Sequence, residues 1–168
     1  IIKYHGAGMD LNWKHWTTAL NEALHSLPLV KLLLEAGADP NIGDDDGDTP
    51  LHIALHNASN NGNLDVIKVL LSHPRTDVNI QSDLGVTPLI SASCTGSPLV
   101  KLLLEAGANP LLTAKHGVHV RTPANFAIRD NHPEVLPLLW SSVNKMVIKY
   151  TFLYYSMTKL TETHTMHI

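Results

Sequence analysis

The chain has 168 residues, of which 44% are hydrophobic and 16% charged, and its formal net charge at pH 7 is −3. That length and apolar content suit one domain with a sizeable core, and the near-neutral charge argues against a nucleic-acid binder, which needs concentrated positive charge. The one cysteine, Cys94, leaves no internal disulfide, and no apolar run reaches the ~18 residues that span a membrane. We therefore expect an intracellular, cytoplasmic protein, with the nucleus as the alternative location.

A six-residue motif recurs four times along the chain. It starts at Thr18, Thr49, Thr87 and Thr122, which are 31, 38 and 35 positions apart, and it reads TALNEA, TPLHIA, TPLISA and TPANFA. Thr can cap a helix, and Pro in the first turn loses no hydrogen bond, so the motif predicts the start of a short helix. The alanine at its sixth position leaves room for a second helix to approach closely.

An apolar block follows each motif and predicts a second helix that is buried on most sides. The blocks are LVKLLL at 29–34, VIKVLL at 66–71, LVKLLL at 99–104 and VLPLLW at 135–140. The first and third belong to the sequence PLVKLLLEAGA, which occurs identically at 28–38 and 98–108. Because its tenth residue is a glycine that can adopt the left-handed conformation, Gly37 or Gly107, we interpret the duplicate as a core face with its helix stop.

These features resemble the ankyrin repeat, whose hallmark is T-P-L-H-x-A with a period near 33. The resemblance covers residues 6–140. It implies an all-α solenoid of stacked helix-turn-helix units with β-hairpin fingers. We expect an array over 1–142, with a partial repeat at 1–12, repeats from about 13, 44, 82 and 115, and a non-repeat tail at 143–168. Because the chain begins with Ile1 rather than Met, we also expect a fragment of a longer protein.

Three segments depart from the repeat pattern. HNASNNGN at 56–63 is polar and predicts a loop, and Pro137 falls inside the expected second helix of the last repeat, where it costs a hydrogen bond. The tail at 145–168, KMVIKYTFLYYSMTKLTETHTMHI, contains no repeat motif. Three interpretations of it stay open, namely a β-prone or helical cap over the last repeat, a disordered tail, or an artefact of how the sequence end was assigned.

The polar residues form no recognisable catalytic or metal motif. His52 and His56 have a zinc-like i, i+4 spacing, but no third ligand is evident, and His52 resembles the family's scaffold histidine, which bonds backbone between repeats. GDDDGDT at 43–49 is not a calcium loop, because the sixth residue from Asp44 is Thr49 where an EF-hand needs glycine. We therefore expect no catalysis, no cofactor and no bound metal.

The resemblance implies a protein partner on the concave surface, which finger tips and the exposed face of each first helix form. In this sequence the finger tips are Lys14, His15, Asp45, Asp46, Asp48, Asp83, Leu84, Val86, His119 and Arg121. The helix positions are His25, Ser26, His56, Asn57, Thr95, Arg129 and Asp130. Trp13 and Trp16 flank the first finger, either as interface anchors or buried against an upstream repeat. We expect a monomeric scaffold or adaptor. Because aspartates dominate the middle of this surface, we expect it to bind a basic segment, and a solvated acidic finger with no partner is the alternative.

Two further interpretations remain open for the function. The chain is alternatively a recognition or targeting fragment of a larger enzyme or signalling protein, such as a ubiquitin-ligase adaptor, a kinase or an effector. A degenerate array without a specific partner is the third interpretation. Asn41 and Asn79 resemble the asparagines that hydroxylases modify in other ankyrin proteins, and bracing of the turn by their side chains is the alternative role.

Overall fold

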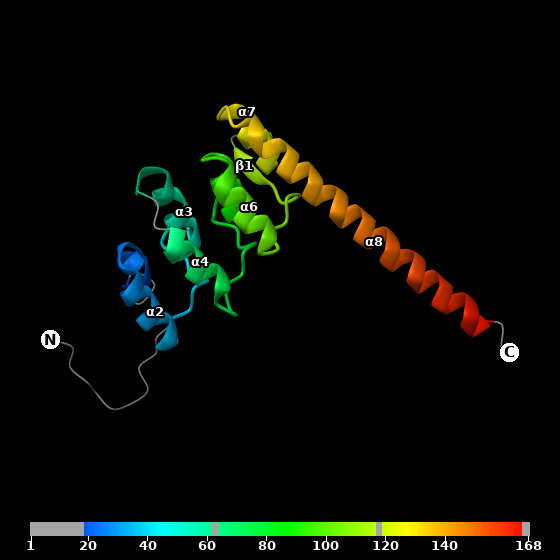
Figure 1. Cartoon of the computed structure of the whole chain (residues 1–168), viewed down its shortest axis with the longest axis horizontal. Coiled ribbons are helices and arrows are strands. Elements are labelled where there is room, and N and C mark those ends of the chain that lie inside the picture. Colours follow the sequence, from blue (N-terminus) through cyan, green and yellow to red (C-terminus); the bar gives the residue numbers. More distant parts are fainter. Residues whose placement is uncertain (1–18, 62–63, 117–118, 166–168) are drawn as a thin grey trace.

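A computed structural model describes residues 19–61, 64–116 and 119–165, which form helix pairs stacked in a row (Figure 1). The elements in chain order are η1 (Ala23–His25), α2 (Leu27–Glu35), α3 (Pro50–Asn61), α4 (Leu64–Ser72), α5 (Pro88–Ser93), α6 (Ser97–Glu105), β1 (Ala114–His116), β2 (His119–Arg121), α7 (Pro123–Arg129), η2 (Pro133–Val135) and α8 (Leu136–Thr165). Helix α3 packs on α4 and α5 packs on α6, while α3, α5 and α7 contact one another in succession. The fold is the all-α solenoid that the sequence predicts.

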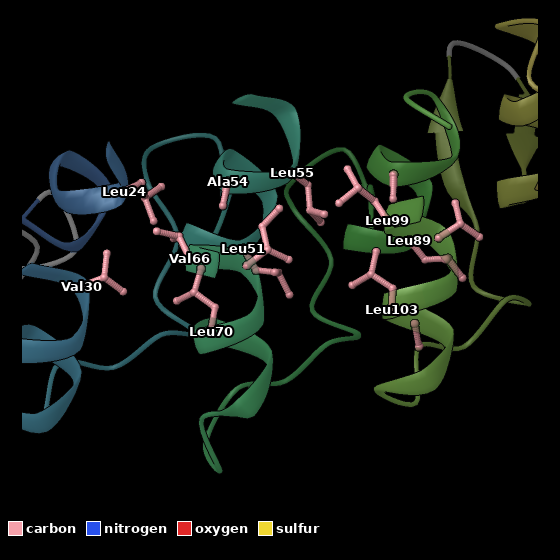
Figure 2. Packing of buried hydrophobic residues seen from close by; sticks show 14 of the residues in the cluster. Leu24, Val30, Leu51, Ala54, Leu55, Val66, Leu70, Leu89, Leu99 and Leu103 are labelled. Carbon is pink, nitrogen blue, oxygen red and sulfur yellow. The ribbon is translucent and has the colours of Figure 1, made fainter. Parts of the chain in front are cut away.

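Leucines, valines and isoleucines from successive pairs form one continuous core. Leu51, Leu55, Leu70, Leu89 and Leu103 are at most 1% exposed, and Figure 2 shows side chains from α3 to α6 gathered between the helices. The last alanine of each motif is also buried, as predicted; these residues are Ala23, Ala54, Ala92 and Ala127. Each fully buried leucine stabilises the array by roughly 1.5–3 kcal/mol relative to an exposed one.

The duplicated sequence is buried differently in its two copies. Val30 and Val100 are both fully buried, but Leu29 is 41% exposed where the equivalent Leu99 is 7% exposed. Leu32 is 60% exposed, so the expectation that the first block is buried on most sides is wrong for α2. Helix α6 contacts α5, η2 and α8, which gives its apolar residues more neighbouring surface to pack against. Both copies end as predicted, with Gly37 at φ 95° and Gly107 at φ 92°.

The first helices of the third and fourth repeats start with the predicted capping chemistry. The Thr87 hydroxyl accepts a hydrogen bond from the Ile90 N–H at 3.2 Å, and Thr122 forms a reciprocal capping box with Asn125. The sequence predicts Pro137 in the interior of the second helix. In the structure the preceding residues Pro133–Val135 form the separate short helix η2, so Pro137 is the second residue of α8. Its missing N–H therefore costs no intrahelical hydrogen bond. The loop predicted from residue 56 is also wrong, since α3 continues to Asn61.

Among the residues that the structure describes, the second and third fingers are tight reverse turns. The Asp44 N–H donates to the Asp48 carbonyl at 3.1 Å, and the Ser82 N–H donates to the Val86 carbonyl at 2.9 Å. The insertion before the fourth motif instead forms the antiparallel pair β1 and β2, with Ala114 opposite Arg121. The fingers thus alternate with the first helices along one side of the solenoid.

Helix α8 runs across the boundary that we expected at 142 and projects away from the stack (Figure 1). Its first turns pack on the array, where Leu139 is 2% exposed. Farther along, Val147, Ile148 and Tyr150 are all more than half exposed. The backbone of 143–165 is therefore helical, as one of the three interpretations has it, but it extends outward instead of covering the last repeat.

His52 joins the second repeat to the third. Its Nδ1 accepts from the Thr49 N–H at 3.2 Å and lies 2.9 Å from the Thr49 hydroxyl, while its Nε2 lies 3.0 Å from the Val86 carbonyl. A carbonyl can only accept, so the proton is on Nε2 and the ring is neutral. Burial lowers the pKa of His52 below its ordinary value, against the opposing effect of the Val86 carbonyl. This is the backbone bond between repeats that the sequence predicts.

Enlarging a buried motif alanine should destabilise the array. Ala92 lies on α5 and is fully buried, so the larger side chain of Ala92→Leu has no space. We expect a loss of about 1–3 kcal/mol in the free energy of unfolding, measured by urea titration with circular dichroism. The matched control Ala106→Leu adds the same side chain at an exposed position and should change stability far less. Equal effects of the two substitutions would contradict the packing assignment.

Acid should weaken the link made by His52. In the unfolded chain His52 takes up a proton near the ordinary pKa of 6.5, whereas in the folded chain burial lowers the pKa of His52 and protonation needs a lower pH. The contribution of the neutral ring is therefore complete above pH 6.5 and is lost as the pH falls toward the lowered folded pKa. In urea titrations between about pH 7.5 and 5.5, His52→Gln should lose part of this pH dependence. His56→Gln, exposed on the same helix, should behave like the unchanged chain; the reverse pattern would contradict the assignment.

Candidate functional site

The second finger is shaped by one carboxylate that points back into its own turn. One oxygen of Asp44 accepts from the N–H of Asp46 at 3.1 Å and from the N–H of Asp48 at 3.0 Å. Gly47 closes the turn at φ 76°, in the left-handed region. Asp44 is thus a structural residue, and the turn that it holds leaves the carboxylates of Asp45 and Asp46 exposed.

Backbone hydrogen bonds align the fingers in one row. The Asp83 N–H donates to the Asp46 carbonyl at 3.1 Å, and the Lys115 N–H donates to the Leu84 carbonyl at 3.1 Å. The Gln81 side chain adds a bond from Nε2 to the Thr113 carbonyl at 2.9 Å. The third finger is therefore bonded to the finger on each side, and the tips cannot move independently without breaking these bonds.

A groove of about 450 Å³ lies between the second and third repeats. It brings together six residues that the sequence places in the partner surface, namely Asp46, Asp48, His56, Asp83, Leu84 and Val86. Its other lining residues are His52, Ile53, Ser82 and Ser91. The sequence assigns none of these four residues to the partner surface, and it gives no signal for the two serines, which reach the groove from the neighbouring repeat.

The groove is electronegative. Asp46 and Asp83 are exposed and Asp48 is half-buried, and the Leu84 side chain beside them is 69% exposed. Burial raises the pKa of Asp48, and the charges of Asp44 and Asp46 raise it further. We call this groove the acidic groove; its carboxylates are those of Asp46, Asp48 and Asp83. Such a surface attracts a cationic partner and selects against an anionic one.

A second groove of about 510 Å³ lies at the last repeat, between β2 and α7. It is lined by Val120, Arg121, Asn125, Ile128 and Arg129, of which Arg121 and Arg129 were predicted to be in the partner surface. Arg129 is engaged within the chain, because its guanidinium donates to both carboxylate oxygens of Asp130 at 2.6 and 2.7 Å. That ion pair holds the pKa of Asp130 below its ordinary range. We name this surface the terminal groove.

Of the remaining predicted residues, His25, Asn57 and Thr95 line neither groove. His25 is exposed at the end of η1, Asn57 is exposed on α3, and Thr95 is half-buried just beyond α5. His119 belongs to strand β2. Trp13, Lys14, His15 and Trp16 lie outside the described residues, so their part in the surface stays a prediction.

Asn41 and Asn79 brace adjacent turns through their side chains. Asn41 donates to the Arg75 carbonyl at 2.5 Å and accepts from the Asp77 N–H at 2.8 Å. Asn79 accepts from the Asn109 N–H at 2.8 Å. These bonds are of the bracing kind that the sequence indicates as the alternative role. Hydroxylation of Asn41 and Asn79 stays a prediction, which mass spectrometry of the isolated protein tests.

The described residues hold neither a metal cluster nor a membrane-spanning helix. Over 19–61, 64–116 and 119–165, no three His, Cys, Asp or Glu side chains gather in a way that suits a metal ion. No helix in these ranges combines the length and the apolar character that crossing a bilayer requires. Cys94 is half-buried with its thiol 3.4 Å from the Ile90 carbonyl, and burial raises its pKa to about 12, so it is not a reactive thiolate.

Comparisons with known proteins agree with the fold. A family model described as ankyrin repeats (3 copies) matches residues 17–114 and 55–149. The putative ankyrin repeat protein YahD of Escherichia coli (strain K12) is 35% identical over 144 residues, which cover 79% of this chain and 68% of YahD. Ankyrin repeats are generally protein–protein interaction modules and are generally not catalytic.

Two human relatives are much longer than the matched segment. Transient receptor potential cation channel subfamily A member 1 is 40% identical over 89 residues, which cover 52% of this chain and 8% of that protein. B-cell lymphoma 3 protein is 37% identical over 103 residues, which cover 59% of this chain and 21% of the relative. The stacked helix pairs, the TPLH histidine bond and the family-model match lead to one conclusion. The chain belongs to the ankyrin repeat family.

Proposed function

We propose that this chain is a protein-recognition module that binds a basic segment of a partner in the acidic groove. The single observation that carries the proposal is the convergence of Asp46, Asp48 and Asp83 on one groove, beside the exposed Leu84. A cationic side chain in the groove meets several carboxylates at once, and its stem can cover the leucine.

The rigidity of the fingers supports recognition without large rearrangement. Asp46 and Asp83 lie on adjacent fingers whose backbones are bonded directly, so the backbone positions that carry the two carboxylates are aligned in the free protein. A surface that is ordered before binding loses little conformational entropy when the partner arrives. Affinity then depends on whether the partner carries its charges at the matching spacing.

Charge reversal in the groove should remove the binding. We would measure the fluorescence anisotropy of a labelled lysine-rich peptide with the full chain and with Asp46→Lys/Asp83→Lys. Asp44 is left unchanged because it holds the turn. The double variant should weaken binding by roughly tenfold or more at low salt, and added salt should weaken binding to the unchanged chain.

The matched control is Glu35→Lys/Glu105→Lys, which makes the same change in net charge at the exposed ends of α2 and α6. This variant should bind the peptide almost as well as the unchanged chain. Circular dichroism establishes that each variant is folded. Equal weakening by both pairs would mean that net charge alone drives the binding, and no weakening by the groove pair would refute the proposed site.

A second proposal is that the module belongs to a larger enzyme or signalling protein and targets it to the partner. The observation that favours it is the small share of two relatives that the match covers, 8% and 21%. A full-length transcript that encodes this array together with a catalytic or signalling domain would support this proposal. An open reading frame that encodes the array alone would contradict it.

A further inference from the structure

The terminal groove exposes large apolar side chains. Val120 on β2 is 65% exposed and Ile128 on α7 is 62% exposed, and both line the same groove of about 510 Å³. Their neighbours Phe126 and Ala127 are almost completely buried in the core of the last repeat, so Val120 and Ile128 stand out from that core as an apolar surface. Apolar side chains gathered at a groove are typical of a surface that a partner covers.

The two arginines of the terminal groove are in different electrostatic states. The guanidinium of Arg129 is held by Asp130 and lies 4.7 Å from the centre of the Phe126 ring. Among the residues that the structure describes, no ion pair joins Arg121 to a carboxylate. The groove thus combines an apolar surface with one cation available to a partner's carboxylate.

The terminal groove and the acidic groove lie along the same row of fingers and first helices. Helix α5 contacts α3 on one side and α7 on the other, and the third finger is bonded to both of its neighbours. Packed helices are separated by about 8–10 Å, so the two grooves are about 10–20 Å apart. An extended chain covers that distance with about three to six residues.

We propose that the partner segment is bipolar, with basic residues in the acidic groove and an apolar residue next to a carboxylate in the terminal groove. The apolar residue packs between Val120 and Ile128, and the carboxylate pairs with Arg121. About three to six residues separate the two parts of the segment. This proposal rests on the proposed function, because it assigns the second half of the same bound segment.

Two labelled peptides test the bipolar segment by fluorescence anisotropy with the full chain. One carries a lysine block, a Gly-Ser spacer of about four residues and a Leu-Leu-Glu block. The other replaces that last block with Ser-Ser-Gln, and each peptide is made with its blocks in both orders, because the grooves do not fix the chain direction. The full chain should bind the better order of the leucine peptide roughly tenfold more tightly than the serine peptide.

Substitutions in the terminal groove should act on the leucine peptide alone. Ile128→Ser should reduce its affinity roughly tenfold, and Arg121→Gln by a smaller factor, while binding of the serine peptide stays the same. Leu32→Ser, at a residue that is 60% exposed on α2, is the matched control and should have no effect.

The outcomes separate this proposal from the proposed function. If both peptides bind the full chain equally and Ile128→Ser changes neither affinity, the bipolar segment is refuted while the acidic groove stands. If neither peptide binds and charge reversal in the acidic groove changes nothing, both proposals are refuted. Loss of secondary structure in Ile128→Ser would be detected by circular dichroism, and the comparison then rests on Arg121→Gln.

Discussion

The structure depends on contact between neighbouring repeats, because one helix pair of this size cannot bury its apolar surface by itself. Leu55 on α3 and Leu89 on α5 are at most 1% exposed only because successive pairs stack. Polar bonds cross the same boundaries, from His52 to Val86 and from Asn79 to Asn109. Stability of such an array is approximately a sum of repeat and interface terms, so a defect at one boundary weakens the repeats on both sides.

The same stacking creates the candidate site. The packing of α3, α5 and α7 places their preceding fingers side by side, and backbone bonds then align Asp46 with Asp83 and Leu84 with Lys115. The acidic groove therefore does not exist within a single repeat. It is formed from the finger and first helix of one repeat and the finger and first helix of the next, which explains how a scaffold with repeated core residues presents a surface that is not repeated.

The sequence predicts the parts of the fold that repeat. Four motifs with capping threonines, buried alanines and helix-ending glycines lead directly to the solenoid, and TPLH predicts the bond made by His52. The errors occur where a local rule competes with packing. The Asn-rich end of α3 stays helical although its composition favours a loop, and Pro137 is accommodated because the short helix η2 precedes it.

The candidate site is only partly predictable for a related reason. Exposed finger residues follow from the repeat register, so six residues of the acidic groove could be named from the sequence. Ser82 and Ser91 could not, because they enter the groove through contact between repeats. The sequence also gives no means of distinguishing Asp44, which bonds to its own turn, from Asp46, which lines the acidic groove, or of showing that Arg129 is paired with Asp130.

The central claim is that the acidic groove is the surface that recognises a basic segment. The most direct measurement is a titration of the nitrogen-15-labelled chain with a lysine-rich peptide, followed by amide chemical shifts. The account predicts shift changes concentrated at residues 44–48, at 82–86 and at Ser91, and saturating with peptide concentration. Changes centred on the second helices α2, α4 and α6, or spread evenly over the array, would contradict it.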